Sequence, residues 1–483
     1  MFTDDARCRA MNQVQPLGLQ GFARFLTPQL FAEAERVVKC VRRGPLSLAN
    51  LTWLGVAAAL HTTKNFAGVL VFTCKLLNDA PGCLRQHRPK LGPRRREGQK
   101  RSKHDPRGSQ SDCVSEEAFA KARQAMPWEY WCALIVLLAD RFASEHDTRV
   151  RWRGFRLLAL DGTLLDLPRQ QALREHFGAA RNQRGGRLPQ ARLLMMEFAL
   201  TRVPFRFRLT PKSCAEKTSA VALLKNLQRH DLVLMDRGFW SYGLFCQIHA
   251  QQACFAIRLI KQARLPVVRK LGPGDALVRF APQDKQWRRL ALPKELVLRR
   301  IEYKVPGFRK TAVITNATDP QQISREDWVG QAVGKSGVAV LDKTLYHRRW
   351  EIETTFSELK IRQGLEQLRS HTPASVRYEV AGHLMLYLLT RWLMVEAAEQ
   401  AGVEPLHLSF LEASRDLQEA MPLLILSPLK QVRRVVLPNL LQRIAQHLVR
   451  QRPGRHYPRP NDTKTRNLGN GRKQIPAKLK RKG

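Results

Sequence analysis

Apolar positions recur at helical spacing through residues 1–80, so this region predicts helices rather than strands. One helix begins at Thr27-Pro28, a suitable N-cap and first-turn pair, and is expected to run through Arg42. A second apolar helix follows from about Ser47. The pattern therefore predicts a small N-terminal helical domain over residues 1–83.

The helical pattern is interrupted by residues 84–114, which are basic, rich in Pro and Gly, and without any period. Such a composition is typical of a linker or a loop. A helical segment resumes over residues 115–146, with Ser115 as its expected N-cap.

Short apolar runs then alternate with helical segments, a pattern that favours a mixed α/β sheet flanked by helices. Asp161-Gly162 lies between the apolar runs Phe155–Leu160 and Leu164–Leu167 and has the signature of a hairpin turn. The other elements expected up to residue 260 are strands at 191–209, Leu232–Met235 and Cys254–Ile260, and helices at 216–229 and 241–251. Residues 115–260 are thus expected to form the first part of one α/β domain.

Residues 261–340 change to short strands separated by turns, which predicts a β-rich insertion into that domain. Its strands are expected at 276–280, 288–292, 296–304 and 310–315. Residues 341–400 are expected to complete the domain, and C-terminal helices follow over 401–450. Residues 451–483 are basic with almost no large apolar side chains, so we expect a tail that is disordered without a partner.

Residues 345–360 predict an amphipathic helix whose faces differ in chemistry. Four polar side chains fall within about 60° of one another on the helical wheel: Tyr346, Arg349, Glu353 and Lys360. An apolar stripe lies beside them: Ile352, Phe356 and Leu359. Glu351 and Glu358 are expected to point away, toward solvent. Glu353 is therefore expected at the edge of the core, either as an ion-pair partner or as a metal ligand.

The charge of the chain is abnormal, although its composition is that of an ordinary folded protein. Lys and Arg number 82 against 41 Asp and Glu, which gives a formal net charge of +41. An excess of this size indicates a polyanionic partner, above all nucleic acid. A membrane surface or an acidic protein fits less well.

The nine cysteines are scattered without a CxxC pair, so we expect a reduced, cytoplasmic compartment and no zinc finger. We expect no secretory signal, because residues 1–20 carry acids early and lack an apolar core. Residues 46–60 are too short and too polar for a membrane span.

Two aspartates share a position relative to the expected strands. Asp161 closes the run FRLLAL and Asp236 closes LVLM, and an acid beside a buried strand end is costly unless it caps a turn or binds something. Taken alone, Asp161 fits a turn better than a catalytic role, and Asp236 fits a turn or an ion pair with Arg237 as well as it fits a catalytic role. Together with Glu353, they supply the oxygen ligands that a pair of Mg²⁺ ions needs for in-line phosphodiester displacement.

At these residues the sequence resembles the DDE transposases of the insertion-sequence-four family. The matching motifs are DGT at 161–163, DRGF at 236–239, and Y-x2-R-x3-E-x6-K within YHRRWEIETTFSELK at 346–360. The resemblance runs from about residue 20 to the tail and is most specific in residues 155–380. It implies a ribonuclease H-like catalytic domain with a β-rich insertion between the second Asp and the Glu.

Carried over residue by residue, the resemblance implies Asp161, Asp236 and Glu353 as ligands of two Mg²⁺ ions, with Mn²⁺ as a substitute. The phosphates of the transposon end would be contacted by Tyr346, Arg349 and Lys360. Family members cut the ends of their element by hydrolysis and join its 3′-OH ends to target DNA. The implied partners are double-stranded DNA, at transposon ends and target, and a second copy of the chain in a synaptic complex, with no membrane.

Two further DNA contacts are weaker predictions. Some family members flip a base onto a tryptophan of the insertion, and Trp287 and Trp328 are the candidates here, although each also fits a core position. Arg237 fits the DRG pattern without an assigned role.

Other interpretations stay open. A nuclease of the same fold would lack strand transfer, and an inactive or domesticated DNA-binding protein would show a lost acid. A basic RNA-associated protein explains the charge but not the three carboxylates. The N-terminal helices fit a packing or dimerisation module as well as a module that binds DNA ends.

Overall fold

The computed structural model describes residues 22, 24–40, 42, 46–66, 68–69, 115–179, 188–282, 292–304, 310–329, 332–333, 338–339 and 344–449. Apart from Val449, these residues lie in one compact unit. Among the helices described in it, none is long and apolar enough to cross a membrane.

The first described helices are α2 (Pro28–Val38) and α3 (Leu48–Leu60). The side chain of Thr27 caps α2 as predicted, and that of Ser47 caps α3. Helix α2 ends before Arg42 because Lys39 adopts the left-handed conformation, at φ 50°. Both helices pack against elements of the α/β region, namely α2 on α6 and α3 on α14.

The expected helical segment 115–146 consists of two helices, α5 (Glu116–Gln124) and α6 (Trp128–Glu145). Ser115 caps α5, as predicted, by accepting a hydrogen bond from the Ala118 amide at 3.2 Å. The segment breaks at Pro127, which has no amide hydrogen to donate and has extended backbone angles. A single turn, α7 (Asp147–Val150), follows.

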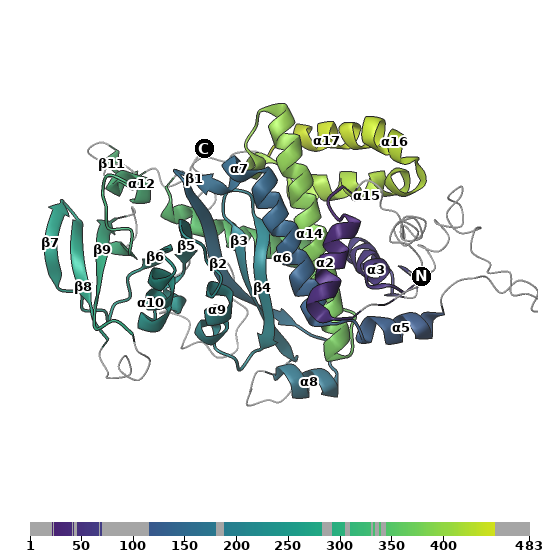
Figure 1. The fold of residues 1–483 in the computed structure, drawn as a ribbon, viewed down its shortest axis with the longest axis horizontal. Helices are drawn as coiled ribbons and strands as arrows, with labels where there is room; N and C mark the ends of the chain where they lie inside the picture. The colour runs from purple at the N-terminus through teal and green to yellow at the C-terminus, as the bar shows by residue number, and fades with distance from the viewer. Residues whose placement is uncertain are drawn as a thin grey trace, which may run out of the picture. The chain divides into compact units, whose positions relative to one another are not determined.

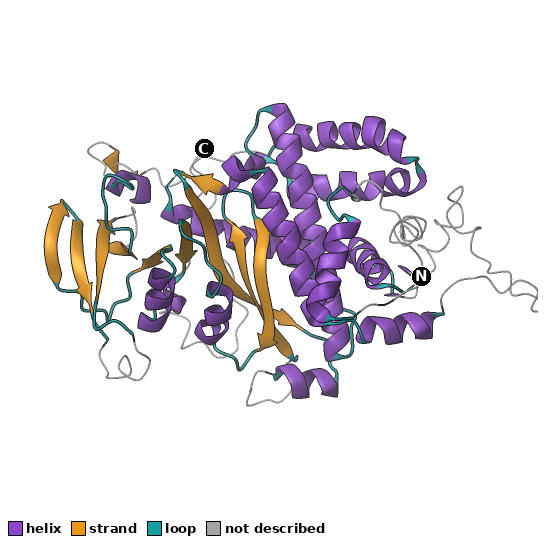
Figure 2. Ribbon diagram, viewed as in Figure 1, coloured by secondary structure: helices purple, strands orange, loops and turns teal. Residues whose placement is uncertain are grey.

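The strands that carry the domain form one sheet (Figures 1 and 2). They are β1 (Arg151–Trp152), β2 (Phe155–Asp166), β3 (Gln190–Phe198), β4 (Val203–Pro211), β5 (Asp231–Met235), β6 (Cys254–Arg258), β7 (Val267–Gly272), β8 (Asp275–Phe280), β9 (Leu296–Tyr303) and β10 (Thr311–Thr315). Their order is β4-β3-β2-β5-β6-β10-β9-β8-β7, and β1 pairs with β2.

The first five long strands have the ribonuclease H-like arrangement. Strands β2, β3 and β4 are antiparallel neighbours, whereas β5 runs parallel to β2 and β6 parallel to β5. Helices α9 (Glu216–Leu224) and α10 (Tyr242–Ala250) cover one face of this sheet, and α6, α13 (Glu351–Ser357) and α14 (Pro373–Ala401) cover the other (Figure 1). The predicted fold class is therefore confirmed.

The predicted hairpin at Asp161-Gly162 is wrong. Strand β2 runs straight through both residues, and Asp161 pairs with Met195 while Gly162 pairs with Leu194 of β3. The continuous ladder with β3 outweighs the local turn preference of the Asp-Gly pair. Glycine suits Gly162 for another reason, because a Cβ there would lie 3.0 Å from a carboxylate oxygen of Glu216 on α9.

The β-rich insertion continues the main sheet. Strand β10 pairs with β6 on one side and with β9 on the other, and β8 and then β7 follow outward. Strand β7 was not predicted, and most of the strand expected at 288–292 lies outside the described residues. The insertion also contributes α12 (Arg325–Val329), β11 (Ala332–Val333) and β12 (Val338–Ala339).

The expected single helix over 345–360 is a composite. It begins as a 3₁₀ turn, η3 (Tyr346–Trp350), continues as α13, and ends in a π turn, η4 (Glu358–Arg362). The chain then enters α14, a largely buried helix of 29 residues. The remaining elements are α8 (Gln171–Phe177), η1 (Arg237–Phe239), η5 (Pro405–His407), α15 (Phe410–Leu426), α16 (Leu429–Gln431), η6 (Val432–Val436) and α17 (Leu437–Gln446).

A carboxyl group is buried in the core beneath α13. Glu197 on β3 is fully buried, and no arginine or lysine among the described residues hydrogen-bonds to its carboxyl oxygens. Burial raises the pKa of Glu197 to about 8, and the nearby Thr355 and Arg202 oppose only part of that rise. Glu197 is therefore largely protonated at neutral pH.

The helices α3 and α14 cross so closely that Gly382 cannot carry a side chain. A Cβ at Gly382 would lie 2.6 Å from the carbonyl oxygen of Gly55, a backbone atom that cannot move aside. We expect Gly382→Ala to lower the free energy of unfolding by about 1–3 kcal/mol in urea denaturation. Gly243→Ala on α10 is the control, because its Cβ would meet nothing closer than 4.0 Å. Equal midpoints for Gly382→Ala and wild type would contradict this crossing.

The raised pKa of Glu197 predicts a pH-dependent stability. The folded state binds this proton more tightly than the unfolded state, so the contribution is fully present below about pH 4.5 and is lost as the pH rises through about 8. The stability of wild type relative to Glu197→Gln should therefore fall over this range in urea denaturation. Glu117→Gln, which alters an exposed acid, should follow wild type. A constant difference between wild type and Glu197→Gln would show that Glu197 is not protonated in the fold.

Candidate active site

The parallel pairing of β2 with β5 brings the two aspartates together. The register of these strands ends at the pair Leu160 and Met235. Asp161 follows Leu160 within β2, and Asp236 follows Met235 directly after β5. Asp236 is also the N-cap residue of η1. Neighbouring strands lie about 4.8 Å apart, so the two carboxylates belong to one site. The sequence could place each acid after an apolar run, but only the register places them beside each other.

Glu353 reaches this site from α13, and Arg349 of η3 lies between the acids. The Arg349 Nη2 atom donates to Glu353 Oε1 at 3.1 Å, and its Nη1 atom lies 3.6 Å from Asp161 Oδ2. Arg349 is buried, whereas the Glu353 side chain is 38% exposed. The buried Nη1 atom has no hydrogen-bond partner. A donor is thus left open beside Asp161.

The electrostatics of the site reflect crowded negative charge. Burial raises the pKa of Asp161 to about 6, the Gly162 amide and Arg349 lower it, and the charges of Asp236 and Glu353 raise it further. Burial alone would lower the pKa of Arg349, but Tyr346 and the three acids raise it overall. The site therefore favours a cation among its carboxylates.

Tyr346 anchors η3 to the end of β5. Its hydroxyl donates to the carbonyl oxygen of Met235 at 3.2 Å, one residue before Asp236. Burial raises the pKa of Tyr346 well above its ordinary value, so the phenol stays a donor. Arg258 on β6 and Tyr303 on β9 lie near the same corner, where Arg258 lowers the pKa of Tyr346 and Tyr303 raises it. Sequence reasoning missed both, and no local motif marks them.

The other predicted site residues are placed differently. Lys360 lies on the π turn and pairs with Glu366 at 3.1 Å. Arg237 is exposed on η1. Trp328 is fully buried on α12, so a flipped base has no access to its ring, and Trp287 lies outside the described residues. No role was predicted for Trp350, which is 40% exposed. The Cζ atom of Arg349 lies 4.5 Å from the centroid of the Trp350 ring.

The expected solvent face of the helix is wrong for Glu351 and Glu358. Glu358 is buried, and the Glu351 side chain is only 16% exposed. Arg202, from the turn between β3 and β4, and Arg391, from α14, meet this side of the helix. A helical wheel contains no information about such distant elements. The face that carries Glu351 and Glu358 was therefore predicted to be exposed to solvent.

The donor set suits a hard divalent cation, although the acids do not enclose one. Across the part of the chain that the structure describes, no three acidic, histidine or cysteine side chains lie close enough together to hold a metal ion. The carboxylates of Asp161, Asp236 and Glu353 offer only oxygen ligands, and Asp161 is desolvated beside like charges. Because the Glu353 side chain is partly exposed, it has room to move toward the two aspartates.

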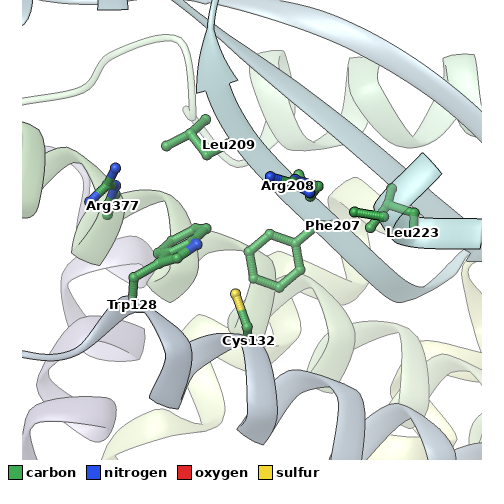
Figure 3. Close-up of a pocket in the computed structure, with 8 residues that line it drawn as sticks. Trp128, Cys132, Phe207, Arg208, Leu209, Leu223 and Arg377 are labelled. Atoms are coloured by element: carbon green, nitrogen blue, oxygen red, sulfur yellow. The ribbon is translucent and has the colours of Figure 1, made fainter. Parts of the chain in front are cut away.

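A separate hollow of about 370 Å³ lies at the outer strand of the sheet, β4 (Figure 3). Residues of α6, β4, α9 and α14 line it: Trp128, Cys132, Phe207, Arg208, Leu209, Ala222, Leu223 and Arg377. Burial raises the pKa of the Cys132 thiol to about 12, so this group is no nucleophile at neutral pH. None of the predicted site residues lines the hollow, and it is not part of the carboxylate site.

Comparisons with known proteins agree with the motifs at this site. The family model described as the transposase DDE domain matches residues 152–389, a range that holds all three carboxylates. The transposase InsG of insertion sequence element IS4, from Escherichia coli strain K12, is 29% identical over 380 residues, covering 73% of this chain and 80% of that protein.

One solved structure also shares a weak likeness. The cryo-EM structure of the piggyBac transposase synaptic complex with hairpin DNA is 12% identical, with a TM-score of 0.40 over 90% of this chain and 86% of that one. The likeness to the family rests instead on the matched domain, the IS4 relative and the three motifs. Residues 152–389 match the transposase DDE domain, and the chain is similar over most of its length to a transposase of insertion sequence element IS4.

Proposed function

We propose that this protein binds the terminal inverted repeats of its insertion sequence, hydrolyses phosphodiester bonds there, and joins the 3′-OH ends to target DNA. The observation that carries the proposal is the convergence of Asp161, Asp236 and Glu353, from β2, the end of β5 and α13, around one buried arginine. A purely structural ion pair would need only one of these acids.

The three carboxylates would hold two Mg²⁺ ions, and Mn²⁺ would substitute. Bound there, the ions would activate the attacking oxygen and stabilise the leaving one. The protein's own part is to keep the three acids near one another, with Asp161 desolvated, and to shield their repulsion with Arg349 until the cations arrive. The open Nη1 donor of Arg349 would then face a phosphate oxygen of the substrate.

The proposed substrate follows from charge and from the family. A chain of net charge +41 binds a polyanion, and the family relationship favours double-stranded DNA. We propose a homodimer that brings two transposon ends together. Lys360 and Arg237 lie on accessible turns and, with the open donor of Arg349, are the proposed phosphate contacts. Tyr346 is buried and holds the site from inside.

Removal of one proposed metal ligand should abolish cleavage while sparing DNA binding. The assay uses a labelled duplex with the element's own terminal repeat, in Mg²⁺, against a scrambled duplex. We expect Asp161→Asn and Glu353→Gln to lower the cleavage rate by about 10³-fold or more, with repeat binding unchanged in a mobility-shift assay.

The matched control is Asp166→Asn, which alters an exposed acid on the same strand, β2. It should cleave at the wild-type rate. Cleavage by Asp161→Asn at that rate would refute the assignment. Specific binding of the repeat by a wild-type protein that cleaves nothing would instead indicate an inactive or domesticated DNA-binding protein.

Loss of a phosphate contact at Lys360 should reduce the salt dependence of DNA binding. We expect Lys360→Ala to weaken binding of the terminal duplex and to reduce the slope of log K against log salt by about 1. Glu366→Gln is the control, because it releases the same ion pair but keeps the lysine. An unchanged slope for Lys360→Ala would show that Lys360 does not contact phosphate.

A further inference from the structure

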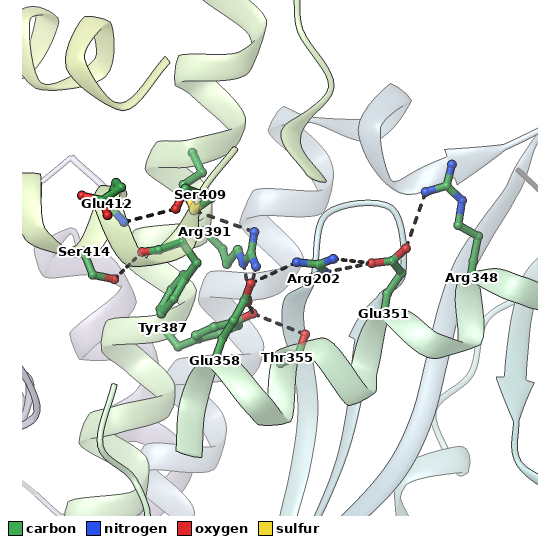
Figure 4. A network of polar contacts seen from close by, with 12 residues as sticks. Arg202, Arg348, Glu351, Thr355, Glu358, Tyr387, Arg391, Ser409, Glu412 and Ser414 are labelled. Carbon is green, nitrogen blue, oxygen red and sulfur yellow. Dashed lines mark hydrogen bonds and ion pairs between the residues drawn. The ribbon is translucent and has the colours of Figure 1, made fainter. Parts of the chain in front are cut away.

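A cluster of charged and polar side chains contacts the face of the helical segment that carries Glu351 and Glu358 (Figure 4). We call it the α13 clamp, and its members are Arg202, Glu351, Glu358, Tyr387 and Arg391. Two of them, Glu351 and Glu358, lie on the helical segment itself, on either side of Glu353 in the sequence. The others come from the β3–β4 turn and from α14.

Arg202 bridges both acids with one guanidinium group. Its Nε and Nη2 atoms donate to Glu351 Oε2 at 2.9 and 2.6 Å, and its Nη1 atom donates to Glu358 Oε1 at 3.0 Å. The Arg202 side chain is only 12% exposed. Because the two acids are about two helical turns apart, one planar group fixes the helix against both rotation and sliding.

The other carboxylate oxygen of Glu358 is held by α14. Tyr387 donates its hydroxyl to Glu358 Oε2 at 2.6 Å, and Arg391 donates to the same oxygen. Arg391 also donates to the Tyr387 hydroxyl at 3.0 Å. Both carboxylate oxygens of Glu358 therefore accept hydrogen bonds. A buried carboxylate can stay ionised when its oxygens are bonded in this way.

The backbone at Arg202 is adapted to this bridge at some cost. Its φ is 57°, in the left-handed region that an arginine occupies rarely. The turn directly follows Phe198, which pairs with Leu158 on β2, three residues before Asp161. Arg202 therefore extends from the sheet that carries both aspartates and grips the helix that carries the glutamate.

Short helices do not hold their own position. Helix α13 spans only Glu351–Ser357, between a 3₁₀ turn and a π turn, and an isolated helix of this length is unstable in water. Apolar contacts of Ile352 and Phe356 fix its distance from the core, but such contacts are non-directional. Directional bonds are needed to set its rotation.

We propose that Arg202 is a positioning residue that fixes Glu353 against Asp161 and Asp236 by bridging Glu351 and Glu358. The inference rests on the proposed function, since it assigns Arg202 a part in DNA cleavage. Arg202 touches neither DNA nor metal ion. It acts through the rotation and register of α13.

The test compares Arg202→Met, which loses the bridge, with Arg202→Lys, which keeps the charge but not the planar fork. Arg443→Met is the matched control, because Arg443 also bridges two acids, Asp416 and Glu419, in the C-terminal helices. We expect single-turnover cleavage of the terminal duplex to fall about 100-fold in Arg202→Met, with an unchanged Kd for the duplex. Arg202→Lys should recover part of this loss, and Arg443→Met should stay within about threefold of wild type.

The Mg²⁺ concentration for half-maximal cleavage separates positioning from general damage. It should rise several-fold in Arg202→Met, because a misplaced Glu353 binds cations less well, and stay constant in Arg443→Met. If Arg202→Met fails to fold, Glu351→Gln removes only one arm of the bridge and should shift the same quantities in the same direction. Wild-type cleavage and Mg²⁺ dependence in folded Arg202→Met or in Glu351→Gln would overturn the proposal.

Amide hydrogen exchange tests the clamp without any activity. In Arg202→Met, or in Glu351→Gln if Arg202→Met does not fold, residues 351–357 should exchange at least tenfold faster than in wild type, while β2 and β5 keep their protection. Unchanged exchange in α13 would overturn the proposal even if wild type cleaves DNA. Faster exchange in a protein whose wild type does not cleave would support the clamp and refute the proposed function, so the two failures are distinguishable.

Discussion

Repulsion among carboxylates is the constraint around which this structure is arranged. Asp236 and Glu353 lie close enough to Asp161 to raise its pKa, in a site where burial already disfavours charge on Asp161. Arg349 relieves that repulsion from within, with one nitrogen toward Glu353 and another toward Asp161. Divalent cations can compete with the Arg349 guanidinium for the carboxylates, because an ion pair is not a covalent bond. The same arrangement therefore stabilises the protein alone and leaves a place that the proposed metal ions and phosphate would enter.

Two different kinds of bond bring the acids together. The aspartates are fixed by backbone hydrogen bonds, since the parallel register of β2 and β5 ends at Leu160 and Met235, immediately before them. The glutamate depends on side-chain bonds, because its helix is short and joins the sheet through Tyr346 on one side and Arg202 on the other. Backbone ladders tolerate many substitutions, whereas each side-chain bond depends on one residue. The placement of Glu353 is thus the part of the site most sensitive to sequence.

The sequence was informative where the determinants of structure are local. Helix caps at Thr27 and Ser115 and the apolar runs of β5 and β6 are found where the pattern predicted them. The four polar residues of the Tyr-Arg-Glu-Lys motif identified the family without any structure. The Asp-Gly turn at 161–162 failed because pairing with β3 decides the conformation there. No local pattern could report that pairing.

The charge state of buried glutamates also could not be predicted from local sequence. A helical wheel for residues 345–360 placed Arg349 and Glu353 on one face, where they are in contact in the structure. The same wheel predicted that Glu358 faces solvent. In the structure Glu358 is buried between two arginines and a tyrosine, and burial without those partners would force it to bind a proton. Glu197, nearby in the core, lacks such partners and is largely protonated at neutral pH. The two acids differ in charge because Arg202 and Arg391 form ion pairs with Glu358, whereas they oppose the raised pKa of Glu197 only in part. Only the tertiary structure reveals that difference.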